Sequence, residues 1–180
     1  MCEPAEEVLV AHVSTGMDTT VPPETVIGAL TDFSEARLAL WPNIDRKYYQ
    51  VHQVAGTSAE VTEGSRGIWE RTHYDWSQPG TVRIDVQDSN AFRPGSYWIY
   101  SVRPRPGGGS HVHLEFLRRP RNARGLLVSA LLSVAGEKIF GDFLGETLHR
   151  LERRSPAAGG SDLSARRPGL DRGPPQTPPS

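Results

Sequence analysis

The sequence has a single cysteine, Cys2, and no hydrophobic run of membrane-spanning length. One cysteine excludes an intrachain disulfide and a cysteine-held zinc or iron–sulfur centre. The longest apolar stretch, residues 126–135, is about ten residues long and contains serines. A membrane-spanning helix needs roughly 20 apolar residues. The first thirty residues show no basic segment followed by an apolar one, so we expect no secretory signal. These absences predict a cytoplasmic protein without stable membrane insertion.

Lysine is also scarce, since only two lysines stand beside 18 arginines, which is typical of a GC-rich bacterial genome. Residues 1–152 carry 15 Lys and Arg against 19 Asp and Glu, whereas residues 153–180 carry five Arg against two Asp. An acidic body does not attract a phosphate backbone, so we expect no nucleic-acid partner. The last 26 residues contain six prolines and four glycines. We therefore predict one domain at residues 1–153 and a disordered tail at residues 154–180.

Extended segments of strand length dominate the first two thirds of the chain. Turn residues rich in glycine divide them, and several segments alternate apolar and polar residues, as in a sheet with one dry face. A short helix is predicted to begin at Pro22-Pro23-Glu24, and a second over residues 34–40. The predicted strands are 6–15, 48–55, 58–63, 67–76, 81–88, 96–104 and 110–118.

The last predicted element is a helix over residues 123–153. At 1.5 Å per residue it measures about 45 Å, which is enough to cross the sheet. Gly136, Gly141 and Gly145 lie inside it, each costing about 0.5 to 1 kcal/mol relative to alanine. They either leave room for a cavity or permit close packing of helix on sheet. The apolar residues that recur at helical intervals are Leu127, Leu131, Val134, Phe140, Phe143, Leu144, Leu148 and Leu151.

The order of these elements is a strand, two short helices, six strands and a long C-terminal helix. Turns and helix ends add detail at residues 21–24, 41–42, 61–65, 102–104 and 108–112. In this order and these turns, residues 6–152 resemble the START-like or SRPBCC superfamily, which includes polyketide cyclase/dehydrase-like proteins and lipid-transfer domains. The resemblance implies an α+β helix-grip fold, in which a curved antiparallel sheet of about seven strands wraps around the C-terminal helix. It also implies a cavity for a hydrophobic small molecule between sheet and helix.

Strand alternation nominates the residues that line this cavity. On the strand at 67–76, the face with Glu70 looks more core-like than the face with Arg71, His73 and Asp75. A cavity with a few polar groups among apolar ones is suited to a ligand. An alternative is that Glu70 pairs with an arginine across strands at the surface while the aromatic residues form plain core. The predicted ligand-binding residues are Glu70, Thr72, Tyr74, Trp98, Tyr100, Phe140 and Phe143.

The sequence contains no P-loop, dinucleotide-binding glycine fingerprint, metalloprotease helix motif or nucleophile elbow. His111 and His113 share one strand face, but they alternate with apolar residues and are expected to point to solvent. We expect no metal site and no cofactor. The leading hypothesis is binding of a lipid, isoprenoid or polyketide-like molecule. The alternatives are a polyketide cyclase or dehydratase, in which Tyr or Glu moves protons, and a surface for protein partners.

Overall fold

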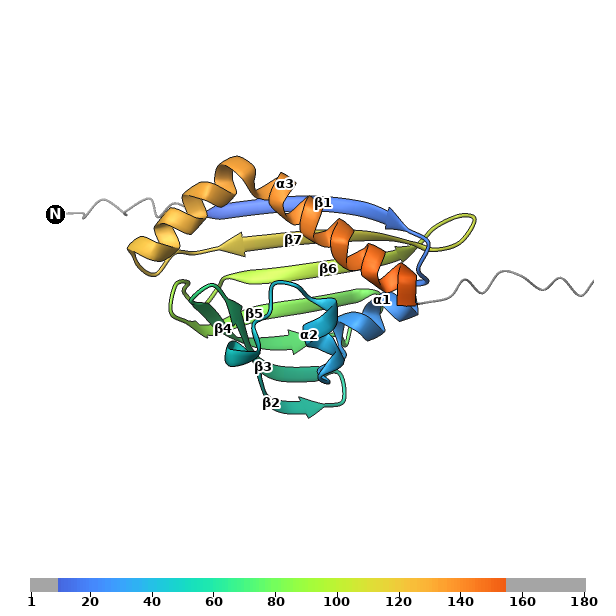
Figure 1. The fold of residues 1–180 in the computed structure, drawn as a ribbon, viewed down its shortest axis with the longest axis horizontal. Helices are drawn as coiled ribbons and strands as arrows, with labels where there is room; N and C mark the ends of the chain where they lie inside the picture. The colour runs from blue at the N-terminus through green and yellow to red at the C-terminus, as the bar shows by residue number, and fades with distance from the viewer. Residues whose placement is uncertain (1–9, 155–180) are drawn as a thin grey trace, which may run out of the picture.

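The computed structural model describes residues 10–154, which form one seven-stranded antiparallel sheet gripping a long helix (Figure 1). The sheet order is β1-β7-β6-β5-β4-β3-β2. This architecture confirms the predicted α+β helix-grip fold with two short helices after the first strand. The strands are β1 Ala11–Thr19, β2 Gln50–Ala55, β3 Ser58–Ser65, β4 Ile68–Asp75, β5 Thr81–Ser89, β6 Tyr97–Pro104 and β7 Ser110–Arg118. The helices are α1 Pro23–Leu30, α2 Ala36–Leu40, the 3₁₀ turn η1 Arg46–Tyr48 and α3 Ala123–Arg154.

The inner face of the sheet follows the predicted alternation of side chains. On β5, Val82, Ile84 and Val86 are buried, while Arg83 points outward. On β7 the same period buries Val112, Leu114 and Phe116. A period of two places every second residue on the dry face, so these two strands fix which side faces the helix.

The outer face of β7 carries the two histidines that the sequence analysis considered as metal ligands. The ring Nδ1 of His111 lies 2.7 Å from Asp18 Oδ1, and the ring Nε2 of His113 lies 3.3 Å from Ser14 Oγ. Both side chains lie on the face of the sheet away from α3, as predicted. Within residues 10–154, no group of three or more His, Cys, Asp or Glu side chains is placed to hold a metal ion.

The first strand lies further along the chain than predicted, at Ala11–Thr19 rather than residues 6–15. It pairs with β7 over its whole length, from Ala11 opposite Arg118 to Thr19 opposite Ser110. The length of β7, its pairing partner, determines where β1 begins and ends. Residues 14–19 therefore form a strand although several of them are polar. Residues 6–9 of the predicted strand lie outside the described residues.

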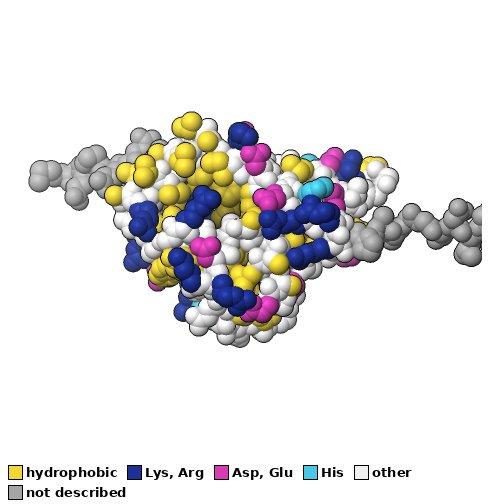
Figure 2. Space-filling view, in the orientation of Figure 1, with side chains coloured by type: hydrophobic (Ala, Val, Ile, Leu, Met, Phe, Trp, Pro, Cys, Tyr) yellow, Lys and Arg dark blue, Asp and Glu magenta, His cyan; other side chains and the backbone are white. Residues whose placement is uncertain are grey.

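The predicted apolar stripe of the long helix is wrong in its N-terminal half. Leu127, Leu131 and Val134 are exposed, Val134 by 90%. The buried residues there are Gly125, Ser129, Leu132 and Gly136, of which only Leu132 is large and apolar. A Cβ built on Gly136 would lie 2.5 Å from Val13 Cγ2, so glycine lets α3 approach β1 closely. Hydrophobic side chains gather on the surface over this half of α3 (Figure 2).

The C-terminal half of α3 buries its large apolar residues as predicted. Leu144, Leu148 and Leu151 join the main core, which α1 and α2 complete beside this end of the helix (Figure 1). α2 ends at Leu40, because the proline at position 42 favours an extended backbone for the intervening Trp41. The predicted tail lies outside the described residues apart from Arg154, which ends α3. None of the helices within residues 10–154 is long and apolar enough to cross a membrane.

Candidate ligand-binding cavity

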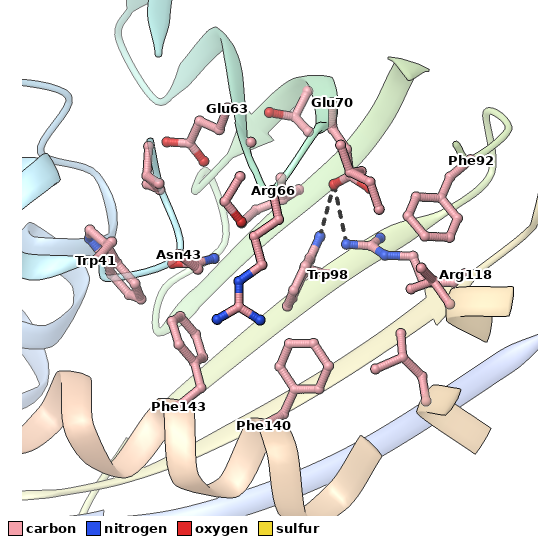
Figure 3. A pocket seen from close by; sticks show the side chains of 18 of the residues that line it. Trp41, Asn43, Glu63, Arg66, Glu70, Phe92, Trp98, Arg118, Phe140 and Phe143 are labelled. Carbon is pink, nitrogen blue, oxygen red and sulfur yellow. Dashed lines mark hydrogen bonds and ion pairs between the residues drawn. The ribbon is translucent and has the colours of Figure 1, made fainter. Parts of the chain in front are cut away.

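A cavity of about 580 Å³ lies between the inner face of the sheet and α3 (Figure 3). Side chains of every strand from β3 to β7, of the segment from α1 to η1 and of α3 line it. Gly136, Gly141 and Gly145 of α3 do not line it, because they face β1. Of the two interpretations of these glycines, close packing is therefore correct. The aromatic residues of the wall are Tyr74, Phe92, Trp41, Trp98, Tyr100, Phe140 and Phe143.

The structure brings all seven predicted site residues to the wall of this one cavity. β4 contributes three of them because its inner face is the one predicted from alternation, while Arg71 on the opposite face pairs with Glu60. β6 contributes two and α3 contributes two. They are Glu70, Thr72 and Tyr74 from β4, Trp98 and Tyr100 from β6, and Phe140 and Phe143 from α3.

Glu70 forms an ion pair with Arg118 inside the cavity. Arg118 Nη2 donates to Glu70 Oε2 at 3.2 Å, and Trp98 Nε1 lies 3.5 Å from the same oxygen. Only 3% of the Arg118 side chain and 14% of the Glu70 side chain are exposed. The alternative that placed this carboxylate at the surface is therefore wrong about the location, although it foresaw an arginine partner.

Burial lowers the pKa of the Arg118 guanidinium below its ordinary value, although the Glu70 carboxylate opposes this shift. The guanidinium lies 4.2 Å from the centre of the Trp98 ring and 5.3 Å from that of Phe92. Sequence reasoning missed Arg118. The signal was available, because residues 112, 114 and 116 face inward on β7 and the next position in this series is 118.

A second buried polar cluster joins α2 to the sheet at the other end of the cavity. Arg37 Nε donates to Glu63 Oε1, Arg37 Nη2 donates to the Tyr74 hydroxyl at 2.8 Å, and that hydroxyl donates to Glu63 Oε2 at 2.6 Å. Arg37 Nη1 donates to the carbonyl oxygen of Leu30 at 3.0 Å. These bonds hold the Arg37 side chain against the wall, so it links α2 to α1 and β3.

The electrostatics of this cluster keep both Arg37 and Tyr74 in their protonated forms. Burial alone would lower the pKa of Arg37, but the Glu63 carboxylate together with Tyr74 and Tyr49 outweighs burial, and the pKa is raised above its ordinary value. Burial also raises the pKa of Tyr74 well above its ordinary value. Sequence reasoning missed Arg37, which follows and precedes apolar residues in α2, and Glu63, which lies near the end of β3.

Aromatic rings form a large part of the remaining wall. Trp98, Phe116 and Phe140 pack together with ring centres 4.2 to 5.3 Å apart. Burial raises the pKa of the Tyr100 hydroxyl, which keeps it protonated at neutral pH. Rings in these edge and tilted contacts form a firm apolar surface that fits flat or branched apolar groups.

Two exposed arginines and an asparagine lie on the cavity's open side. Arg66 stands in the turn between β3 and β4 and reaches toward Phe143 of α3 (Figure 3). Arg124 at the start of α3 donates from Nη1 to the carbonyl oxygen of Gly67 at 2.9 Å. Asn43 follows α2 on the same wall. The entrance is therefore more basic than the interior.

Residues 10–156 match the family model described as "Polyketide cyclase / dehydrase and lipid transport". The chain belongs to this family. The match spans the whole helix-grip body, from the start of β1 to just past the end of α3. The predicted membership of the START-like superfamily is thereby confirmed.

Solved structures agree with this family in fold. The Zhui aromatase/cyclase from Streptomyces sp. R1128 superposes with a TM-score of 0.69 at 14% identity, covering 84% of this chain and 99% of that one. A START superfamily protein from Mycobacterium smegmatis gives a TM-score of 0.61 at 18% identity, covering 80% and 99%. The major latex-like protein 151 from Panax ginseng gives 0.59 at 12% identity, covering 81% and 97%. A comparison with curated protein sequences gives no significant match.

Proposed function

We propose that this protein binds a hydrophobic small molecule, such as a lipid, an isoprenoid or a polyketide-like compound, in the cavity between the sheet and α3. The observation that carries the proposal is an aromatic-walled cavity of about 580 Å³ whose buried charges are paired with one another, Arg37 with Glu63 and Arg118 with Glu70. Small-molecule sites are typically concave and mainly apolar, with volumes of about 300 to 1,000 Å³ and a few placed polar side chains. The family membership supports the same conclusion.

In this proposal the seven wall residues nominated from the sequence form the ligand-contacting set. Trp98, Phe140 and Phe143 would contact the apolar body of the ligand, while Glu70 and Tyr100 would orient its polar groups. The basic entrance at Arg66 and Arg124 would meet the part of the ligand that stays near solvent.

The first test is native mass spectrometry of the freshly purified protein, which should detect a co-purifying small molecule. The second is titration with N-phenyl-1-naphthylamine, an uncharged apolar dye whose fluorescence rises in an apolar site. Trp98→Ala should weaken dye binding by about tenfold, because it removes a large aromatic contact surface. Trp69→Ala is the matched control, since Trp69 lies on the same strand as Glu70 and does not line the cavity. Absence of dye binding, or equal weakening by the two substitutions, would contradict the proposal.

A cyclase or dehydratase that works on a ligand in the same cavity is the alternative function. Glu70 and Tyr100 on the wall support this enzymatic alternative, since a carboxylate and a phenol can transfer protons. The raised pKa of Tyr100 makes this hydroxyl a weak acid at neutral pH, and Glu70 is already engaged by Arg118. Both features favour binding over proton transfer. With a poly-β-ketone substrate, an enzyme would lose turnover but keep affinity in Glu70→Gln or Tyr100→Phe.

A further inference from the structure

Two histidines on the outer face of the sheet, away from the cavity, bring one free ring nitrogen each to the same place. A Cβ added to Gly16 of β1 would lie 3.0 Å from His111 Nε2 and 3.5 Å from His113 Nδ1. Gly16 stands directly opposite His113 in the sheet, and both histidines belong to β7. Among residues 10–154, neither of these two nitrogens has a hydrogen-bond partner. Free imidazole nitrogens are ligands suited to zinc, nickel and copper.

The opposite nitrogen of each ring is held by a side chain of β1. His111 Nδ1 lies 2.7 Å from Asp18 Oδ1, and His113 Nε2 lies 3.3 Å from Ser14 Oγ. A carboxylate only accepts hydrogen bonds, so Nδ1 of His111 carries the proton and Nε2 of the neutral ring keeps its lone pair. The Ser14 hydroxyl can accept from His113 Nε2 in the same way, which leaves Nδ1 of that ring with its lone pair. A histidine that binds a metal commonly donates its other nitrogen to such an acceptor, which fixes both the ring and its tautomer.

Glycine at position 16 makes room for the two rings. The backbone of Gly16 does not have a positive φ, so its conformation alone does not require glycine. Glycine weakens the interior of a strand, and there it often marks a place where a ligand or another backbone approaches closely. The three atoms nearest to an added Cβ all belong to the rings of His111 and His113, and none belongs to a backbone. The position is therefore kept small for the sake of the two histidines.

We propose that His111 Nε2 and His113 Nδ1 together bind a divalent transition-metal cation of the zinc, nickel or copper class. Zinc sites usually have three or four protein ligands, so with two histidines water completes the coordination and the site stays open. Magnesium and calcium do not fit, because they prefer oxygen ligands. Strand alternation alone predicted no metal site, since it does not reveal that Asp18 and Gly16 stand opposite the two histidines. The site lies outside the cavity, so this inference goes beyond the proposed function and does not depend on it.

The test is isothermal titration calorimetry of the full chain with nickel chloride at about pH 7.5, where histidine is mostly neutral. The unaltered protein should bind one nickel ion per chain at this site, and magnesium chloride should give no binding heat. His111→Gln and His113→Gln should each weaken nickel binding by at least about tenfold, because each removes one of only two protein ligands. The double variant His111→Gln/His113→Gln should lose the site. The matched control is His52→Gln/His73→Gln, which removes two histidines from β2 and β4 and should leave the affinity unchanged.

Two further variants keep both ligands and change only what positions them. Asp18→Asn removes the carboxylate that accepts from His111 Nδ1, and it should weaken nickel binding by about tenfold, since such supporting contacts are typically worth 10- to 100-fold in metal affinity. Asp18→Glu should restore part of this loss, because it keeps the carboxylate. Gly16→Ala places a methyl group 3.0 Å from His111 Nε2 and should also weaken binding. Gly28→Ala is its control, because an added Cβ there meets no atom within 4 Å.

The paired variants separate a site at these two histidines from general binding of nickel to histidines on the surface. Nickel binding that survives in His111→Gln/His113→Gln, or that falls equally in the control variant, would overturn the site, and so would absence of nickel binding in the unaltered protein. Binding of one ion by two chains would overturn the open coordination, because a second copy would then supply the remaining ligands. Unchanged affinity in Gly16→Ala would overturn the role of the glycine. Binding of N-phenyl-1-naphthylamine should be the same with and without nickel, so the proposed function is tested separately.

Discussion

Glu70 of β4 and Arg118 of β7 meet inside the cavity although β5 and β6 lie between their strands in the sheet. The contact is possible because both side chains project from the concave face, where curvature brings non-neighbouring strands together. Trp98 of β6 lies between the two strands and approaches the same carboxylate oxygen. The pair therefore ties the two halves of the sheet together across the site.

Removing one charge of this pair should destabilise the protein strongly. Glu70→Gln leaves the buried guanidinium of Arg118 without its counter-charge, and we expect a loss of about 3 kcal/mol in the free energy of unfolding. Urea unfolding followed by circular dichroism measures this change. Glu60→Gln is the control, since Glu60 and Arg71 pair at the partly exposed outer face of the sheet. It should cost less than about 1 kcal/mol. Equal losses in the two variants would contradict the buried character of the Glu70–Arg118 pair.

Two phenylalanines, one in the packed core and one on the cavity wall, should differ in their contribution to stability. Phe116 is fully buried in packed core, whereas Phe143 borders the cavity and is only partly buried. Phe116→Ala should cost about 3 to 5 kcal/mol, because it creates a new cavity in packed surroundings. Phe143→Ala should cost clearly less, since its ring already lacks neighbours on one side. Thermal and urea unfolding of the two variants measure the difference. A larger loss for Phe143→Ala would mean that its ring is packed rather than cavity-lining.

The sequence predicted the inner face of the sheet well because hydrophobic alternation is strong where one face is dry. Val82, Ile84 and Val86 on β5 orient their neighbours, and a strand paired in register cannot expose the opposite face without moving every side chain. This constraint carries over to β4, where aromatic residues occupy both faces and the local pattern alone is ambiguous. Neighbouring strands thus resolved the orientation of Glu70, Thr72 and Tyr74.

Hydrophobic periodicity does not identify the charged residues and small residues that are buried in the interior. Arg37 and Arg118 are both buried beside a carboxylate, and these carboxylates, Glu63 and Glu70, lie 26 and 48 residues away in the sequence. On α3 the buried positions include Ser129 and Gly136, so ranking residues by hydrophobicity selects Leu131 and Val134, which are exposed. Close approach of two backbones leaves no hydrophobic signal in the sequence.

Two glycines within helices should respond in opposite directions to the same substitution. Gly28→Ala in α1 should stabilise the protein by about 0.5 to 1 kcal/mol, because alanine is the better helix former and an added Cβ would meet no atom within 4 Å. Gly136→Ala should destabilise it despite the same gain, since the Cβ would lie 2.5 Å from Val13 Cγ2. The melting temperatures of the two variants decide the sign. Stabilisation by Gly136→Ala would mean that α3 and β1 pack less closely than the structure places them.

The C-terminal end of α3 should give the stability a dependence on pH in the acidic range. Glu152 accepts hydrogen bonds from Thr19 Oγ1 at 2.7 Å and from the Thr20 backbone N–H at 3.1 Å, which hold the helix to the end of β1. The Thr19 hydroxyl is the main cause that lowers the pKa of Glu152 below its ordinary value of 4.5. A lowered pKa in the folded state means that the carboxylate stabilises the fold above this value, and that the stabilisation is lost as the pH falls through the folded-state pKa.

Glu152→Gln should therefore lower the free energy of unfolding by about 1 kcal/mol at pH 7, as expected for a hydrogen bond at a partly exposed site. The difference from the unaltered protein should shrink as the pH falls below 4.5, because protonation then removes the charge of Glu152 in the unaltered protein, which the glutamine variant lacks at every pH. Urea unfolding at several pH values measures this convergence. Glu146→Gln is the control, since Glu146 pairs with Arg150 on the exposed side of α3 and should change the stability little at any pH. A gap between Glu152→Gln and the unaltered protein that stayed constant down to pH 2.5 would show that the threonine bonds do not depend on the charge of Glu152.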